Sequence, residues 1–190
     1  FSPVDPAPAV IPSADAVERA LKLLSAAEKP LVILGKGAAY AQADREIREF
    51  VETTGVPYLP MSMAKGLLPD DHPQSAAAAR SFVLENADVV MLVGARLNWL
   101  LTHGRGRHWN PHNKFIQLDI DPVEIDSNRP IAAPVVGDIA SSVRLLLNGL
   151  ERHPVRAPAD WLSAIDAAKR PNVAKMEEKL NAEAAPMNFF

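Results

Sequence analysis

Asp88-Val89-Val90-Met91-Leu92-Val93-Gly94 is the strongest strand signal in the chain. A short apolar run that ends in glycine is typical of a strand buried on both faces of a parallel sheet. Leu31-Val32-Ile33-Leu34, closed by Gly35, has the same character, as does Phe115–Ile120. Two shorter runs are also predicted as strands: Val56–Leu59 and Pro134–Asp138.

Amphipathic segments lie between these runs. Apolar residues there recur at three- and four-residue spacing, which predicts helices with one buried face. Ser13 is a suitable N-cap for the first helix, and Gly55 a suitable end for the second. Helices that alternate with buried strands indicate crossover connections. We therefore predict a Rossmann-like α/β fold: a doubly wound, mostly parallel sheet of five to six strands with helices on both faces. The predicted helices are Ala14–Leu24, Gln42–Thr53, Ala76–Leu84 and Ala140–Leu150.

Proline-rich stretches divide the chain into three parts. We expect residues 1–12 to be an N-terminal linker and residues 13–152 to be one central nucleotide-binding domain. Residues 153–190 are expected to be a linker and a connecting helix, Asp160–Glu183, interrupted at Pro171 and leading towards a C-terminal domain that the chain lacks. Both ends look cut from a longer polypeptide.

Composition excludes several classes of function. The net charge of −3 argues against a general nucleic-acid binder. No cysteine is present, which removes disulfides, thiolate zinc sites and a cysteine nucleophile, and fits a reducing, cytoplasmic location. No apolar run approaches the roughly 18 residues that cross a bilayer, and no signal peptide is visible. The histidines lack metal-ligand spacing, so no metal site is predicted.

Three candidate binding residues directly follow predicted strands. Lys36 stands between Gly35 and Gly37, where backbone N–H groups could approach a phosphate; the alternative is a tight turn that needs glycine. Arg96 could bind a base or a phosphate, or be an ordinary surface arginine. Asp119 could accept hydrogen bonds from a ribose, while Asp121 caps the following turn ahead of a proline.

Three further segments are weaker candidates. Asp138 most simply caps a helix, and the neighbouring Ile139 could lie on a nucleotide base. The alanine run with Arg80 leaves backbone accessible to a ligand, but a short solvated helix is the simpler interpretation. His103–His108 could hold phosphate, although a solvated loop is the simpler interpretation there too. No acid–base pair or nucleophile stands out, so the chain is interpreted as a binding domain without a reaction centre.

Taken together, these residues resemble the middle domain of thiamine-diphosphate enzymes, over roughly residues 13 to 150. Within that superfamily, segments 94–100 and 126–139 and the alanine run before Arg80 are similar to the oxalyl-CoA decarboxylase family. The matching pieces occur in family order: Lys29–Gly37, Met63–Gly66 with Asp71–Pro73, Ala87–Arg96, Gln117–Pro122 and Val135–Asp138.

The resemblance implies that this domain binds ADP as an activator rather than FAD. The parent enzyme would be a cytoplasmic homotetrameric lyase of oxalate catabolism, converting oxalyl-CoA to formyl-CoA and carbon dioxide. Its thiamine diphosphate and magnesium sites would lie in the other domains of the polypeptide, and the chain alone would be inactive. The implied ADP-binding residues are Lys36, Arg96, Asp119 and Ile139 with Gly35 and Gly37, and the implied coenzyme A contacts are Ala77, Ala78, Ala79, Arg80 and Ser81.

Several rival interpretations stay open. A 2-hydroxyacyl-CoA lyase would share the ADP and coenzyme A features, whereas an acetohydroxyacid synthase or a glyoxylate carboligase would bind FAD here. An NAD-consuming deacylase has a related sheet but needs four zinc-ligating cysteines, which this chain lacks. A stand-alone adenine-nucleotide sensor is the alternative of another class.

Overall fold

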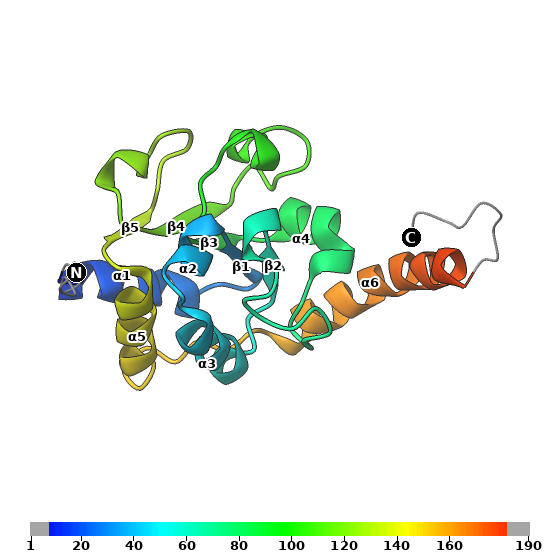
Figure 1. The fold of residues 1–190 in the computed structure, drawn as a ribbon, viewed down its shortest axis with the longest axis horizontal. Helices are drawn as coiled ribbons and strands as arrows, with labels where there is room; N and C mark the ends of the chain where they lie inside the picture. Colours follow the sequence, from blue (N-terminus) through cyan, green and yellow to red (C-terminus); the bar gives the residue numbers. More distant parts are fainter. Residues whose placement is uncertain (1–7, 182–190) are drawn as a thin grey trace, which may run out of the picture.

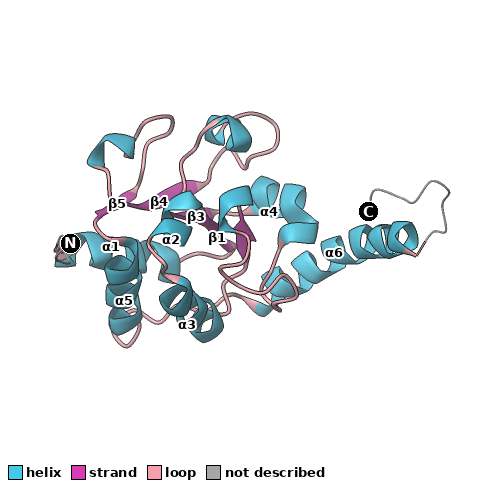
Figure 2. Cartoon of the chain, in the orientation of Figure 1, coloured by secondary structure: helices cyan, strands magenta, loops and turns pink. Residues whose placement is uncertain are grey.

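The computed structural model describes residues 8–181 and contains one sheet of five parallel strands. The strand order is β2-β1-β3-β4-β5. Helices cover both faces (Figures 1 and 2), so the predicted doubly wound α/β fold is confirmed. The strands are β1 (Pro30–Leu34), β2 (Tyr58–Pro60), β3 (Val89–Val93), β4 (Lys114–Asp119) and β5 (Ala133–Val136).

Six α-helices and four short 3-10 helices connect the strands within the described residues. The α-helices are α1 (Ala14–Ser25), α2 (Lys36–Tyr40), α3 (Asp44–Thr54), α4 (Arg80–Asn86), α5 (Ile139–Gly149) and α6 (Ala159–Leu180). The 3-10 helices are η1 (Ser62–Ala64), η2 (Ala77–Ala79), η3 (Trp99–Gly104) and η4 (Pro122–Glu124).

Successive residues of each strand point to opposite faces of the sheet and enter two separate hydrophobic cores. Val32 and Leu34 of β1 pack with α1, α3 and α5 in one core. Leu31 and Ile33 of the same strand pack with α4 and α6 in the other. Because both faces are covered, β1 and β3 are apolar at every position, which is why the sequence shows continuous apolar runs instead of alternation.

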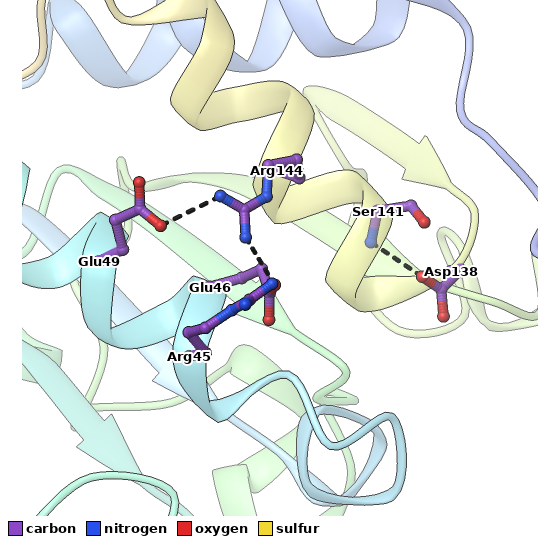
Figure 3. A network of polar contacts seen from close by, with 6 residues as sticks. All are labelled: Arg45, Glu46, Glu49, Asp138, Ser141 and Arg144. Atoms are coloured by element: carbon purple, nitrogen blue, oxygen red, sulfur yellow. Dashed lines mark hydrogen bonds and ion pairs between the residues drawn. The ribbon is translucent and has the colours of Figure 1, made fainter.

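Charged side chains join α3 to α5 along the surface of the first core (Figure 3). Arg144 donates from Nη2 to Oε1 of Glu46 at 2.7 Å and from Nη1 to Oε2 of Glu49 at 3.1 Å. Asp138 caps α5, because its Oδ2 accepts a hydrogen bond from the backbone N–H of Ser141 at 2.8 Å. The capping role predicted for Asp138 is therefore confirmed.

The C-terminal helix differs from the prediction. We expected an interruption at Pro171, and this was wrong: α6 runs through it without a break. A proline inside a helix removes one N–H donor and its ring crowds the carbonyl of the preceding turn, but the helix is held at the next residue, because Nδ2 of Asn172 donates to the carbonyl of Ala78 at 2.7 Å. Trp161 and Ile165 are buried in the second core, so α6 begins on this domain (Figure 1).

Helix α2 was not foreseen, because five residues that follow a glycine carry no periodic signal. Three segments lie outside the described residues: positions 1–7 of the predicted N-terminal linker, positions 182–183 at the end of the predicted helix, and positions 187–190. Within residues 8–181, no helix has both the length and the apolar character needed to cross a bilayer.

Candidate functional site

The strand order reverses between β1 and β3. The chain passes from β1 to β2 on one side, then returns to the other side of β1 to form β3. Open α/β sheets bind ligands outside the carboxyl ends of their strands at such a switch point. Here these ends are Gly35, after β1, and Gly94, after β3.

The glycines at this point bring two backbones into contact. The N–H of Gly35 donates to the carbonyl of Val93, and the N–H of Gly37 to that of Gly94, each at 2.9 Å. A Cβ on Gly37 would lie 2.8 Å from the Cα of Gly94, and one on Gly35 would collide with the Gly94 carbonyl oxygen. Glycine is therefore needed because the two backbones approach closely. A left-handed backbone is not the reason, since Gly35 has φ of −109°. The expectation that these two N–H groups face a phosphate is not met.

Two hollows open at this edge and share Lys36, Gly94 and Arg96; we call them together the edge groove. The first, the basic half, has an empty volume of about 540 Å³, which includes space open to solvent. Lys36 and Arg96 are its only charged residues among those described. Its lining residues are Gly35, Lys36, Met61, Ser62, Met63, Gly94, Ala95, Arg96, Asn98 and Leu100.

The second hollow, the acidic half, has an empty volume of about 570 Å³. It combines two cations with three carboxylates. Lys36, Arg96 and Asp119, which follow or end three neighbouring strands, thus line one common space, as the sequence predicted. The lining residues are Lys36, Gly37, Tyr40, Gly94, Arg96, Asp119, Asp121 and Glu124.

Arg96 already has an anionic partner inside the groove. Its Nη1 donates to Oε1 of Glu124 at 2.7 Å, and this hydrogen bond raises the pKa of Arg96. The ammonium of Lys36 lies 4.8 Å from the ring centroid of Tyr40, which is a cation–π distance.

Asp119 lies half-buried at the end of β4 and accepts a hydrogen bond from the N–H of Asp121 at 3.1 Å. Burial raises the pKa of Asp119, and the charge of Glu124 raises it further. A carboxylate with such a shift in a groove marks a candidate binding residue. Asp121 caps η4 through the N–H of Val123, which confirms its predicted local role.

The segment expected to contact coenzyme A lies beside the groove. Residues 77–81 form η2 and the start of α4, with Ala79 buried and Ser81 exposed. Arg80 and Ser81 line a third hollow of about 520 Å³, and Leu100 borders both this hollow and the basic half. The alanine backbone is only partly accessible, because Asn172 binds the carbonyl of Ala78.

Arg80 is a cation without a carboxylate partner among residues 8–181. Its guanidinium donates to the carbonyl of Leu100 at 3.3 Å and contacts the sulfur of Met61 at 3.8 Å. Burial lowers the pKa of Arg80. A partly buried cation held only by neutral groups is suited to an anionic ligand.

Ile139 is the one predicted ADP residue that the structure places away from the groove. It begins α5 with its side chain 3% exposed in the first hydrophobic core. The buried side chain of this isoleucine therefore has a packing role. A sequence motif does not distinguish such a role from a contact with a ligand.

The segment His103–His108 is tied to its surroundings. Arg105 donates from Nη2 to the carbonyl of Asn128 at 2.7 Å, and His108 lies 3.5 Å from a carboxylate oxygen of Glu85. Thr102 and His103 adopt positive φ. Within the described residues, no group of three or more His, Cys, Asp or Glu could hold a metal ion.

Tyr40 and Glu124 are two of the groove residues that sequence reasoning missed. Glu124 follows the end of β4 by five positions, and Tyr40 ends α2. Both stand shortly after a strand on the carboxyl side of the sheet, which is a positional signal that could have identified them.

Residues 17–146 match the family described as the central domain of thiamine pyrophosphate enzymes, thiamine pyrophosphate being the same cofactor as thiamine diphosphate. The chain belongs to this family.

Among curated relatives, oxalyl-CoA decarboxylase of Escherichia coli strain K12 is 58% identical over 186 residues, covering 98% of this chain and 33% of the relative. A 2-hydroxyacyl-CoA lyase of Oryza sativa subsp. japonica is 44% identical over 178 residues, covering 93% and 31%. The chain therefore spans about a third of the length of these relatives.

A solved structure from Mycobacterium smegmatis, described as a thiamin diphosphate-dependent enzyme, superposes with a TM-score of 0.62 at 22% identity. The match covers 84% of this chain and 31% of that one. This likeness supports the fold.

Proposed function

We propose that the edge groove binds ADP and that this domain regulates a thiamine-diphosphate-dependent decarboxylase of oxalyl-CoA. The observation that carries the proposal is the convergence of Lys36, Arg96 and Asp119 from three neighbouring strands on one hollow. Two cations suit a diphosphate, and a carboxylate suits ribose hydroxyls.

The distribution of charge orients the nucleotide. All three carboxylates are in the acidic half, so the ribose belongs there, against Asp119. The phosphates belong at Lys36 and Arg96 and extend into the basic half, which has no carboxylate among its described lining residues.

Apolar side chains at the acidic half suit the adenine base. Tyr40 is 72% exposed and lines the hollow, while Ile120 and Val123, 61% and 80% exposed, flank its carboxylates in the sequence. Exposed aromatic and aliphatic groups bury surface when a base lies on them. We therefore assign the base contact to Tyr40, Ile120 and Val123, since the side chain of Ile139 is buried.

The neighbouring hollow at Arg80 and Ser81 is proposed to take the phosphate-bearing end of coenzyme A. The support is the half-buried guanidinium of Arg80, which lacks a carboxylate partner within the described part of the chain. An Arg80→Ala change is expected to weaken coenzyme A binding about tenfold, because hydrogen bonds to charged groups contribute about 1.5–3 kcal/mol. ADP binding should be unaffected.

For the parent enzyme we propose release of carbon dioxide from oxalyl-CoA to leave formyl-CoA. Thiamine diphosphate, when bound, supplies a nucleophilic carbon and an electron sink. Its site and the magnesium ion are placed in the other domains, and the homotetrameric, cytoplasmic parent belongs to the same proposal. The chain is 58% identical to an oxalyl-CoA decarboxylase and 44% identical to a 2-hydroxyacyl-CoA lyase. This difference supports decarboxylation as the first candidate activity and the lyase reaction as the second.

The test is calorimetric titration of the chain with ADP, FAD and coenzyme A. ADP should bind, and Arg96→Ala should weaken it about tenfold or more through the lost charged hydrogen bonds. Arg45→Ala on α3 is the matched control, because it removes the same charge from a side chain 79% exposed. Tighter binding of FAD than of ADP, or equal effects of the two substitutions, would contradict the proposal.

A further inference from the structure

The guanidinium of Arg96, at the centre of the edge groove, is already neutralised within the chain. Its Nη1 lies 2.7 Å from Oε1 of Glu124, and the two side chains are 53% and 27% exposed. Both residues line the acidic half. A phosphate that approaches Arg96 therefore meets a cation that is paired with a carboxylate.

The position of Glu124 is set by its surroundings rather than by Arg96 alone. The buried side chain of Gln117, on β4, donates from Nε2 to the backbone carbonyl of Glu124 at 3.2 Å. Asp121 caps the 3-10 helix that ends at Glu124. The carboxylate is thus presented to the groove from an anchored backbone.

The charge balance around this pair is unfavourable for an anion. In the acidic half, Asp119, Asp121 and Glu124 outnumber Lys36 and Arg96 by three to two. Of these carboxylates, Glu124 is the one that forms an ion pair with Arg96. Removing it would change the half from an excess of negative charge to balance.

Resting on the proposed nucleotide function, we propose that Glu124 is an internal anion that competes with the ligand's phosphate for Arg96 and so lowers the affinity of the groove for nucleotides. Binding of a phosphate exchanges one anionic partner of Arg96 for another. The ion pair has to open whichever nucleotide binds, and the negative charge of Glu124 repels a diphosphate more than a monophosphate, so Glu124 lowers the affinity for ADP at least as much as for AMP.

A partly exposed ion pair can open at modest cost, which makes this exchange feasible. The pair has to open before a phosphate can replace Glu124, so removal of Glu124 should strengthen ADP binding about two- to fivefold. ADP should gain at least as much as AMP, because it carries more negative charge. The difference in ADP affinity between the wild-type chain and a variant without Glu124 should narrow as the salt concentration rises, because salt screens charges that are exposed to solvent.

The experiment is calorimetric titration of the wild-type chain, Glu124→Gln and Glu124→Ala with ADP and AMP at low and high salt. Glutamine keeps the size of the side chain, and alanine removes it, so a gain shared by both variants identifies the lost charge as the cause. Glu49→Gln on α3 is the matched control: this glutamate also pairs with an arginine and is 51% exposed. The Glu49→Gln variant should bind ADP with the same affinity as the wild-type chain.

Unchanged or weaker ADP binding in both Glu124 variants would overturn the inference and leave the nucleotide function standing, since Glu124 would then merely hold Arg96 in place. A gain for AMP that exceeds the gain for ADP would also overturn it. Failure of the wild-type chain to bind either nucleotide would overturn both the proposed function and the inference.

Discussion

At the scale of single residues, three glycines, Gly35, Gly37 and Gly94, allow the backbones that follow β1 and β3 to approach each other closely. Gly35 and Gly37 donate backbone hydrogen bonds to Val93 and Gly94, and the space beside their Cα atoms is filled by the backbone at Gly94 and Ala95. These contacts bring Lys36 and Arg96 to one groove. The glycines therefore act on function through packing.

Gly35→Ala should destabilise the domain by about 3 kcal/mol, because the added methyl group meets backbone that cannot move aside. Urea unfolding measures this. Gly55→Ala is the control: its Cβ would meet nothing within 4 Å, and its φ of +67° alone costs about 1–2 kcal/mol. Equal losses in the two variants would show that contact with Gly94 does not matter.

Asp119 illustrates the cost of placing a carboxylate at the end of a buried strand. Burial and the nearby Glu124 raise the pKa of Asp119 above its value in the unfolded chain. The folded state then binds this proton more tightly than the unfolded state does. Stability linked to Asp119 is present below its ordinary pKa and is lost as the pH rises through its raised pKa.

Asp119→Asn should therefore increase the free energy of unfolding at pH 7, because a neutral amide replaces the partly buried charge and can still accept from the N–H of Asp121. The gain should vanish below a pH of about 3.9, where the unfolded chain is also protonated. Urea unfolding across this pH range tests the sign. The exposed Asp71→Asn should stay within about 0.5 kcal/mol at every pH.

At the scale of elements, α6 has two unlike parts. Near its start, Trp161 is 3% exposed, stacks on Phe82 at 5.7 Å between centroids and donates from Nε1 to the carbonyl of Pro30 at 2.9 Å. Further along, Met176 is 45% exposed, and the helix extends away from the sheet (Figure 1). The first part stabilises this domain.

Trp161→Ala should destabilise the domain by about 3–5 kcal/mol, since it opens a cavity in the second core and leaves the carbonyl of Pro30 unpaired. Thermal or urea unfolding gives the value. Met176→Ala in the same helix should change stability by about 0.5 kcal/mol or less. A small effect at Trp161 would mean that α6 does not belong to the folded unit.

At the scale of the whole molecule, the strand order places one groove at the carboxyl edge of the sheet. The groove gathers cations, carboxylates and apolar side chains at the reversal between β1 and β3. The chain covers about a third of its curated relatives. Its contribution to a larger enzyme is expected to be recognition and regulation.

The isolated chain, supplied with thiamine diphosphate and magnesium, is expected not to convert oxalyl-CoA. The residues of the edge groove are proposed to bind nucleotides, and the sites of thiamine diphosphate and magnesium are proposed to lie in the other domains of the parent enzyme. Chromatographic detection of formyl-CoA measures turnover, and retained ADP binding serves as the control for a folded sample. Turnover above the rate without protein would contradict this division of tasks.

Local features followed from the sequence alone. The apolar runs located the strands because most positions of a strand buried on both faces are apolar. Ser13, Gly55, Asp121 and Asp138 were predicted to cap or end local structure, and each does so. Such roles depend on backbone angles and neighbours a few residues away, so a linear pattern contains them.

Relations between distant segments were decided only by the tertiary structure. The order of the strands, the pairing of Arg96 with Glu124 and the docking of Trp161 on Pro30 each join residues 17 or more positions apart. The same cause buried Ile139, which a motif had suggested for a ligand, in the core. Side chains from separate elements meet only after packing sets the layers, and no local pattern specifies which of them will share a groove.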